Sequence, residues 1–128
     1  MVLVDTSIWI RFLAGREPYA RQLDRLLASD RVLGHELVYG ELLIGDRGRT
    51  RGALLAAYSE IHRARTVSHS DAIALVEARQ LRGRGIGWID VHLLATALVE
   101  RCTLWSADLA LATLAAELRI AYAGTSSR

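Results

Sequence analysis

Four of the 14 acidic residues stand at positions where a carboxylate is unusual. Two interrupt strongly apolar helical patterns, and two come just after apolar runs that are typical of buried strands. They are Asp5, Glu41, Asp90 and Asp108. Gathered at one site, four carboxylates would repel one another, and a divalent cation would resolve that repulsion. Carboxylate and water ligands suit hard ions such as Mg²⁺ or Mn²⁺. The four residues therefore predict a metal-dependent catalytic site, with one or two ions equally consistent with the pattern.

Glu41 lies inside an apolar helical pattern that runs from His35 to Ile44. Its neighbours at helical spacing include Leu37 and Val38 as well as Ile44, so we expect all of them on one inner face. An unpaired buried carboxylate costs free energy, or its pKa shifts until it is neutral. Pairing with an arginine is one remedy, and a bound metal is the other.

Asp90 shows the same anomaly near the start of the apolar helix predicted at Trp88–Glu100. Leu93 and Leu94 follow it at helical spacing. The helix macrodipole stabilises an acid at this end by about 0.3–1 kcal/mol, so an ordinary helix-start residue is the alternative. The apolar surroundings favour a functional role.

Asp5 directly follows the apolar run Val2–Val4, which is typical of a buried strand. Functional sites in parallel α/β sheets form beyond the carboxyl ends of the strands. Asp5 could instead cap the next helix, but Thr6 or Ser7 could also do that. We therefore favour function over capping at Asp5.

Asp108 follows the predicted strand Thr103–Trp105 and falls in the first turn of the next helix, with Ser106 as the expected N-cap. Taken alone, it is more often a helix-start aspartate. Its place just past the carboxyl end of a strand adds weight to a functional role. Of the four acids, it is the one we expect outside the inner shell of the metal.

The elements that must position these acids alternate between strands and helices. Ser68 and Asp71 form a start similar to a capping box for one of the helices. Strands are predicted at 2–4, 31–34, 61–67, 103–105 and 119–122, and helices at 8–13, 17–28, 35–44, 50–60, 68–81, 88–100 and 107–117. This alternation favours right-handed βαβ crossovers and a mostly parallel sheet with helices on both faces.

Size and composition exclude several classes of protein. The chain has 128 residues and a hydrophobic fraction of 52%, which fits a single folded domain over 1–128. No apolar run is long enough to span a bilayer, and the first residues lack the features of a signal peptide. Cys102 stands alone, so we expect a buried thiol and a reducing, cytoplasmic setting.

All 16 positively charged side chains are arginines, and lysine is absent. The chain therefore has no lysine for a Schiff base or a P-loop. Phosphatases and receiver domains that place acids at strand ends ordinarily use a lysine as well. The dehalogenase-like phosphatase pattern also requires a second aspartate where Ser7 stands.

Taken together, the ordered motifs resemble those of PIN-domain ribonucleases. The residues that carry the likeness are Val4-Asp5-Thr6-Ser7, the helix around Glu41, Trp88–Ala95 and Leu104–Asp108. More closely, the chain is similar to VapC toxins of type II toxin–antitoxin modules, over essentially its whole length. Each motif alone is short, but the ordered set is fairly specific.

This resemblance implies a three-layer α/β/α sandwich with a mostly parallel five-stranded sheet. It implies an endoribonuclease dependent on Mg²⁺ or Mn²⁺, in which metal-activated water cleaves RNA phosphodiester bonds. It further implies a homodimer and inhibition by a cognate VapB-like antitoxin, whose C-terminal segment enters the acidic groove. The alternative is a catalytically inactive PIN-fold module that binds RNA or a partner. Retention of all four acids argues against that alternative, because a site for polyanionic RNA would not otherwise gather negative charge.

Carried over by position, the acidic residues of the family fall on Asp5, Glu41, Asp90 and Asp108. Ser7 and Ser106 match its small hydroxyl positions, which support the carboxylates or bound water, and we count Thr6 with them. The chain departs from the family at Ala107, where a basic or polar residue is common, and at His92, where an apolar residue is common.

Arginine pairs well with phosphate, and Arg82 and Arg84 lead into the Asp90 helix, so we expect them to bind the RNA backbone. A further arginine cluster includes Arg47. A solvated surface with internal ion pairs is the alternative for any one arginine. For His92 we expect a hydrogen-bonded residue on a packed helix rather than a proton shuttle. The three tryptophans are expected in the core or an interface rather than stacked on RNA bases.

Overall fold

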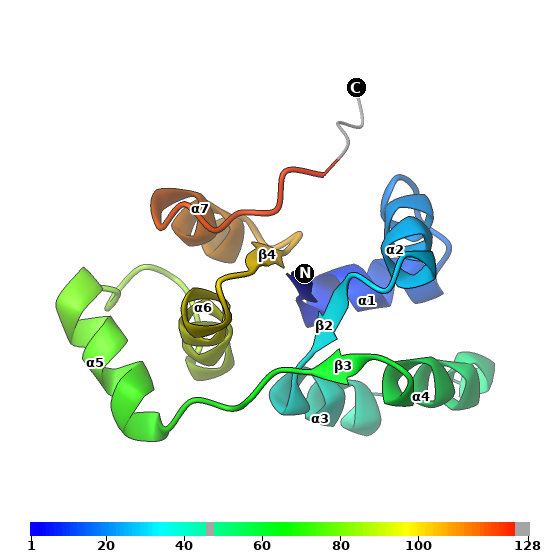
Figure 1. The fold of residues 1–128 in the computed structure, drawn as a ribbon, viewed down its shortest axis with the longest axis horizontal. Coiled ribbons are helices and arrows are strands. Elements are labelled where there is room, and N and C mark those ends of the chain that lie inside the picture. Colours follow the sequence, from blue (N-terminus) through cyan, green and yellow to red (C-terminus); the bar gives the residue numbers. More distant parts are fainter. Residues whose placement is uncertain (46–47, 125–128) are drawn as a thin grey trace.

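The computed structural model describes residues 1–45 and 48–124 (Figure 1), so Arg47 lies outside the described residues. Within them, four short strands form one parallel sheet in the order β3-β2-β1-β4. The strands are β1 (Val2–Val4), β2 (Val32–Gly34), β3 (His62–Arg63) and β4 (Thr103–Trp105). Leu3 in the central strand β1 is in register with Leu33 on one side and Leu104 on the other.

The helices pack on both faces of this sheet. They are α1 (Thr6–Leu13), α2 (Tyr19–Ala28), α3 (Glu36–Ile44), α4 (Arg51–Ser59), α5 (His69–Arg79), α6 (Trp88–Glu100) and α7 (Leu109–Glu117), with a 3₁₀ turn at Gly48–Thr50. Figure 1 shows α1 and α2 on one side of the sheet and α6 and α7 on the other. The architecture is the predicted three-layer α/β/α sandwich. In the described part of the chain, no helix has the length and apolarity needed to cross a membrane.

The central strand is buried on both faces. Every residue of β1 is at most 1% exposed, which explains why its sequence is continuously apolar rather than alternating. Ile8 and Trp9 of α1 and Leu93 and Leu94 of α6 are fully buried in the same core. Cys102 is also buried, as expected, and burial raises the pKa of its thiol.

Two strand predictions were too long. The strand predicted at 119–122 is only a single parallel bridge between Leu104 and Ala121. The amide of Leu104 donates to the carbonyl of Ile120 at 2.7 Å, so the segment still lies beside β4. Arg119 has a left-handed φ of 61° and turns the chain just before the bridge, which leaves too short an extended run for a regular strand. The sheet therefore has four regular strands among the described residues and not five.

The strand predicted at 61–67 was also wrong in its extent. Only His62 and Arg63 are in β3, at the edge of the sheet, and both are exposed. The amide of Ala64 makes one more bond to the carbonyl of Gly34 at 2.8 Å, and the chain then leaves the sheet.

The predicted start of α5 is confirmed. Ser68 is its N-cap, and the Ser68 hydroxyl accepts a hydrogen bond from the amide of Asp71 at 3.0 Å. The helix ends at Arg79, because Gln80 adopts a left-handed conformation. A loop then leads from α5 to α6.

A buried polar cluster fixes the carboxyl end of β2. The hydroxyl of Tyr58 accepts from the amide of His35 at 2.7 Å and donates to the carbonyl of His35 at 3.1 Å. The Nδ1 atom of His35 accepts from the amide of Leu37 at 3.0 Å and so caps α3. Its Nε2 atom lies 3.2 Å from the Thr96 hydroxyl on α6. The cluster thus joins α3, α4 and α6.

We expect Tyr58→Phe to destabilise the fold by about 1–3 kcal/mol at pH 7, because the buried amide of His35 loses its partner. Burial raises the pKa of Tyr58 to about 12. An unfolded tyrosine ionises near pH 10, whereas the folded Tyr58 stays neutral up to about pH 12. The free energy of unfolding of the wild type therefore falls by roughly 3 kcal/mol relative to that of Tyr58→Phe as the pH rises through this range. Urea denaturation of both proteins at pH 7 and at pH 11 checks this. The difference in free energy of unfolding between the two proteins should be smaller at pH 11 than at pH 7. The same difference at both pH values would contradict the assignment.

Candidate active site

Asp5 lies at the end of β1 and is only 6% exposed. Its amide bonds to the carbonyl of Trp105 at 2.9 Å, which places it beside the end of β4. Its Oδ2 atom accepts hydrogen bonds from the hydroxyls of Ser7 at 2.7 Å and Ser106 at 2.8 Å. Two adjacent strand ends therefore hold this carboxylate.

Asp5 is also the N-cap residue of α1, but its side chain makes no capping bond. Neither Thr6 nor Ser7 caps the helix, contrary to the alternative weighed from the sequence, because α1 already begins at Thr6. The carboxylate of Asp5 is instead turned towards the end of β4. Helix capping thus does not explain this acid.

Ser7 and Ser106 link the turns after β1 and β4. The Ser7 hydroxyl accepts from the amide of Ala107 at 2.9 Å, and the two hydroxyls lie 3.4 Å apart. The Ser106 hydroxyl accepts from the amide of Asp108 at 3.0 Å. The structure therefore places both serines next to the Asp5 carboxylate.

Asp108 is exposed and is itself the N-cap of α7. Its Oδ1 atom accepts from the amide of Leu111 at 3.1 Å, so the prediction of Ser106 as the N-cap was wrong. The ordinary helix-start role is thus present in the geometry, although Asp108 also lies at the carboxyl end of β4. This is the weakest of the four acids as a metal ligand.

Glu41 is half-buried on α3, where the Thr6 hydroxyl donates to its Oε1 atom at 2.6 Å. The inner face of α3 differs from the expected one. Val38 and Leu42, four residues apart, form its buried stripe, while Ile44 is 88% exposed. Ile44 follows Leu42 by only two positions, about 200° around the helix, so it faces away from the core. Among the described ion pairs, no arginine neutralises Glu41.

Asp90 lies in the first turn of α6, and its Oδ2 atom accepts from the amide of Gly87 at 3.1 Å. Burial raises the pKa of Asp90, and the Gly87 bond opposes that rise. The negative charges of Asp5, Asp108 and Glu41 raise this pKa further. Asp90 thus lies within reach of the charges of the other three acids that the sequence singled out.

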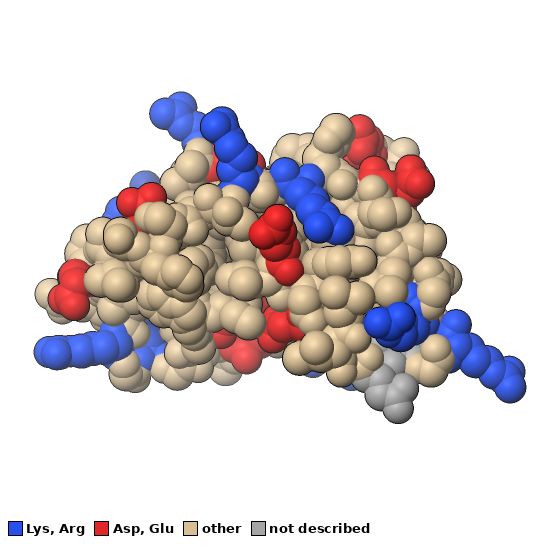
Figure 2. All heavy atoms as spheres, turned by 90° about the horizontal axis from the view of Figure 1, so that it is seen from below, with Lys and Arg blue, Asp and Glu red and all other residues tan. Residues whose placement is uncertain are grey.

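The donor chemistry of this edge suits a hard divalent cation, because it consists of carboxylate and hydroxyl oxygens. Within residues 1–45 and 48–124, no three acidic, histidine or cysteine side chains are drawn together into a ready-made metal cage. Hydroxyl and backbone donors instead bind the carboxylates of Asp5, Glu41 and Asp90, which come from separate elements. Figure 2 shows acidic side chains in the middle of one face and also near its left and upper right margins, with arginines beside the central ones as well as projecting at the top, left and right.

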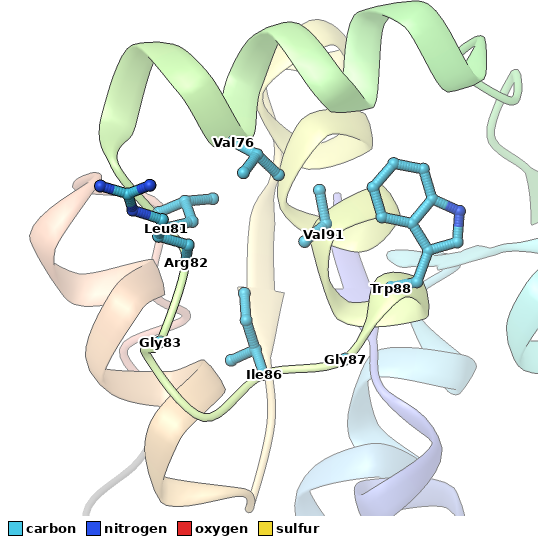
Figure 3. Close-up of a pocket in the computed structure, with 8 residues that line it drawn as sticks. All are labelled: Val76, Leu81, Arg82, Gly83, Ile86, Gly87, Trp88 and Val91. Carbon is cyan, nitrogen blue, oxygen red and sulfur yellow. The ribbon is translucent and has the colours of Figure 1, made fainter.

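The two arginines predicted to bind RNA have different surroundings. Arg84 makes an ion pair with Glu117 on α7 at 2.6 Å, which raises the pKa of its guanidinium. Arg82 is exposed and lies at one end of an apolar pocket of about 230 Å³ between α5, α6 and the connecting loop. Figure 3 shows the guanidinium of Arg82 turned away from Val76 and Val91, which line that pocket.

The aromatic residues of α6 match the expectation only in part. His92 is buried at 4% exposure, but its Nε2 atom has no hydrogen-bond partner among the described residues, so only the packed half of that prediction is confirmed. Trp9 and Trp105 are in the core as expected. Trp88 is 43% exposed and is therefore not a core residue.

Sequence reasoning gave no role to His35, which the structure places at the junction of β2, α3 and α6. Its bonds to Tyr58 and Thr96 bring together the helices that carry Glu41 and Asp90. The sequence offered one signal, namely a histidine at the point where an apolar strand pattern changes to a helical one. Its partners are 23 and 61 residues away, so spacing alone could not reveal them.

Comparison with known proteins shows the family of the chain. The family model of the PIN domain matches residues 2–117. Ribonuclease VapC32 of Mycobacterium tuberculosis, from strains CDC 1551 and H37Rv, is 36% identical over 124 residues, which are 96% of this chain and 97% of that protein. The chain therefore belongs to the PIN-domain family and is of the VapC type.

Solved structures show the same fold. FitAcB from Neisseria gonorrhoeae has a TM-score of 0.62 at 19% identity, and the match covers 91% of this chain and 94% of that one. VapBC2 from Rickettsia felis, bound to a DNA fragment from its promoter, has a TM-score of 0.58 at 20% identity, with 85% and 89% covered. At such low identity, these likenesses confirm the fold alone.

Proposed function

We propose that this protein is a metal-dependent endoribonuclease and the toxin of a type II toxin–antitoxin pair. The observations that support the proposal are that the charges of Asp5, Glu41 and Asp108 act on Asp90, and that Asp5 and Asp108 follow the paired strands β1 and β4. The name of the 36% identical relative, a VapC ribonuclease, supports RNA as the substrate.

We assign Mg²⁺ or Mn²⁺ to Asp5, Glu41 and Asp90, with Asp108 at the rim. When bound, such an ion would supply an activated water and a positive charge for the leaving oxygen of a phosphodiester. Ser7 and Ser106 bind Oδ2 of Asp5, and the described contacts leave Oδ1 open to a ligand.

The Thr6 hydroxyl likewise donates a hydrogen bond to Oε1 of Glu41. The hydroxyls thus fix the carboxylate orientations before any ligand binds. Such supporting contacts are worth roughly 10–100-fold in metal affinity or activity.

Arg82 and Arg84 remain our candidates for contacts with the RNA backbone. Because Arg84 shares its charge with Glu117, we expect the larger contribution from Arg82. Each such contact would make RNA affinity fall as salt rises.

The partner would be a VapB-like antitoxin that covers the acidic edge, and the protein would form a homodimer. The VapBC2 structure from Rickettsia felis is named as a complex, which supports a toxin–antitoxin pairing for a relative of the same fold. The proposed homodimer rests on family likeness alone.

The experiment that tests the function is cleavage-site mapping of RNA treated with the purified protein in Mg²⁺ or Mn²⁺. We expect internal cuts at a limited set of sequences. Intact RNA under every condition, with binding retained, would contradict the proposal and support the inactive RNA-binding module instead.

A further inference from the structure

Trp88 and His69 form a flat aromatic surface at the start of α6. The indole N–H of Trp88 donates to Nδ1 of His69 at 3.3 Å, and the two ring planes differ by only 6°. Because this N–H and the imidazole lone pair both lie in the planes of their rings, the rings must sit edge to edge in nearly one plane. Both residues are exposed. We call this pair the aromatic platform.

His92 supports the aromatic platform. Its ring stands nearly perpendicular to both rings, at 85° to His69 and 87° to Trp88, with centroid distances of 5.0 and 4.9 Å. Its Nε2 atom is buried and unpaired among the described residues. A buried polar atom without a partner is destabilising, and a ligand that hydrogen-bonds to it would relieve that cost.

Hollows adjoin the aromatic platform on two sides. One is a cavity of about 300 Å³, lined by His35, Leu37, Thr66, Val67, Ser68, His69 and His92. The other is the apolar pocket of Figure 3, which Trp88 closes with its indole nitrogen turned away from Val76 and Ile86. Both hollows have mostly apolar walls, and hydroxyl and imidazole groups in the first cavity can make hydrogen bonds to a polar ligand.

Helices α6 and α3 contribute both to the aromatic groups and cavity and to the acids, while His69 comes from α5. Trp88 and His92 lie two residues on either side of Asp90 in α6, so they share a face of that helix about 160° around its axis from Asp90, but within about 3 Å of Asp90 along the axis. The cavity is lined by His35 and Leu37 at the start of α3, which also carries Glu41. A single-stranded chain that runs from the acidic edge around the start of α6 would reach the aromatic platform.

We propose that the aromatic platform and the His92 cavity form a nucleobase subsite of the cleavage site. The base of a nucleotide flanking the scissile phosphate stacks on Trp88 and His69, and its polar edge enters the cavity. Proteins recognise single-stranded RNA by stacking unpaired bases on aromatic side chains and by hydrogen bonds to the base edges. This inference rests on the proposed function, and it makes the subsite a determinant of sequence preference.

The first test measures steady-state cleavage of a short single-stranded RNA centred on a site mapped with the wild type. We expect Trp88→Ala to raise KM about 5- to 100-fold, the range for loss of one stacked base, and to leave kcat within about threefold. Trp88→Phe, which keeps an aromatic face, should restore most of the affinity. Ile73→Ala on α5, where the side chain is 52% exposed, serves as the matched control and should behave as wild type.

The second test removes the base instead of the ring. An abasic nucleotide at the stacked position should weaken the wild type as much as Trp88→Ala does, and should weaken Trp88→Ala no further. Additive losses at every position flanking the cut would overturn the proposal. So would an unchanged KM together with lost partner binding or lost self-association, which would make the platform a protein interface.

A third measurement does not depend on cleavage. Trp9 and Trp105 are buried, so quenching of tryptophan fluorescence by oligoadenylate or oligouridylate should come from Trp88 and disappear in Trp88→Phe. Quenching that persists in Trp88→Phe would contradict the subsite. A wild type that shows quenching but no cleavage would overturn the proposed function while leaving base binding in place.

Discussion

Asp5→Asn is expected to lower the rate of RNA cleavage by roughly 10²-fold or more while the protein stays folded. The asparagine keeps the size of the side chain, and its amide oxygen can still accept the hydrogen bonds of Ser7 and Ser106. What it loses is the negative charge at the buried end of β1. Initial rates under saturating metal, with circular dichroism and Tm for both proteins, check this result.

Matched carboxylate variants separate a site effect from a general loss of charge. Asp24→Asn, on the exposed face of α2, should cleave as the wild type does. Asp90→Asn should be as damaging as Asp5→Asn. Asp108→Asn should have a smaller effect, because that side chain is exposed and caps α7. Wild-type rates for both Asp5→Asn and Asp90→Asn would show that the proposed site is wrong.

The position of Asp5 could be predicted because it depends on local sequence and one rule of parallel sheets. An apolar strand pattern followed by an acid places that acid at the carboxyl edge. The structure pairs β1 with β4, with Leu3 opposite Leu104, and this pairing brings the second strand end beside Asp5. The same rule led to Asp108, although the structure shows that this residue also has an ordinary capping role.

Two features were less predictable: which face of a helix is buried, and how far a short strand at the edge of the sheet extends. Apolarity alone placed Ile44 on the inner face of α3, but the buried stripe passes through Val38 and Leu42. The 119–122 segment has strand-like composition, yet the left-handed Arg119 leaves it as a bridge. In both cases the backbone path decided the outcome, not the residue type.

Contacts between distant residues could not be read from spacing at all. The bonds of Tyr58 and Thr96 to His35, and of Trp88 to His69, join positions 19 to 61 residues apart. Each partner looks ordinary in its own segment. Such polar pairs become visible only once the fold brings their elements together.

Removal of divalent metal is expected to abolish cleavage, because the acidic edge has no other source of compensating charge among its described contacts. Burial and the charges of Asp5, Asp108 and Glu41 all raise the pKa of Asp90. Without a cation, the ionised form of Asp90 is therefore destabilised by desolvation and by charge repulsion. EDTA should therefore stop cleavage, and excess Mg²⁺ or Mn²⁺ should restore it. Cleavage that continues unchanged in EDTA would contradict the metal assignment.

The same repulsion predicts a change in stability that does not require RNA. A cation that binds only the folded state at about 100 times its Kd stabilises it by about 2.7 kcal/mol, so Mg²⁺ or Mn²⁺ should raise the Tm of the wild type. Asp5→Asn and Asp90→Asn each remove one negative charge from the cluster. Each variant should therefore match or exceed the Tm of the metal-free wild type and gain little when metal is added. Asp24→Asn should keep the full metal-dependent rise, since its charge lies outside the acidic edge. An equal rise in all four proteins would place the bound ion away from these carboxylates.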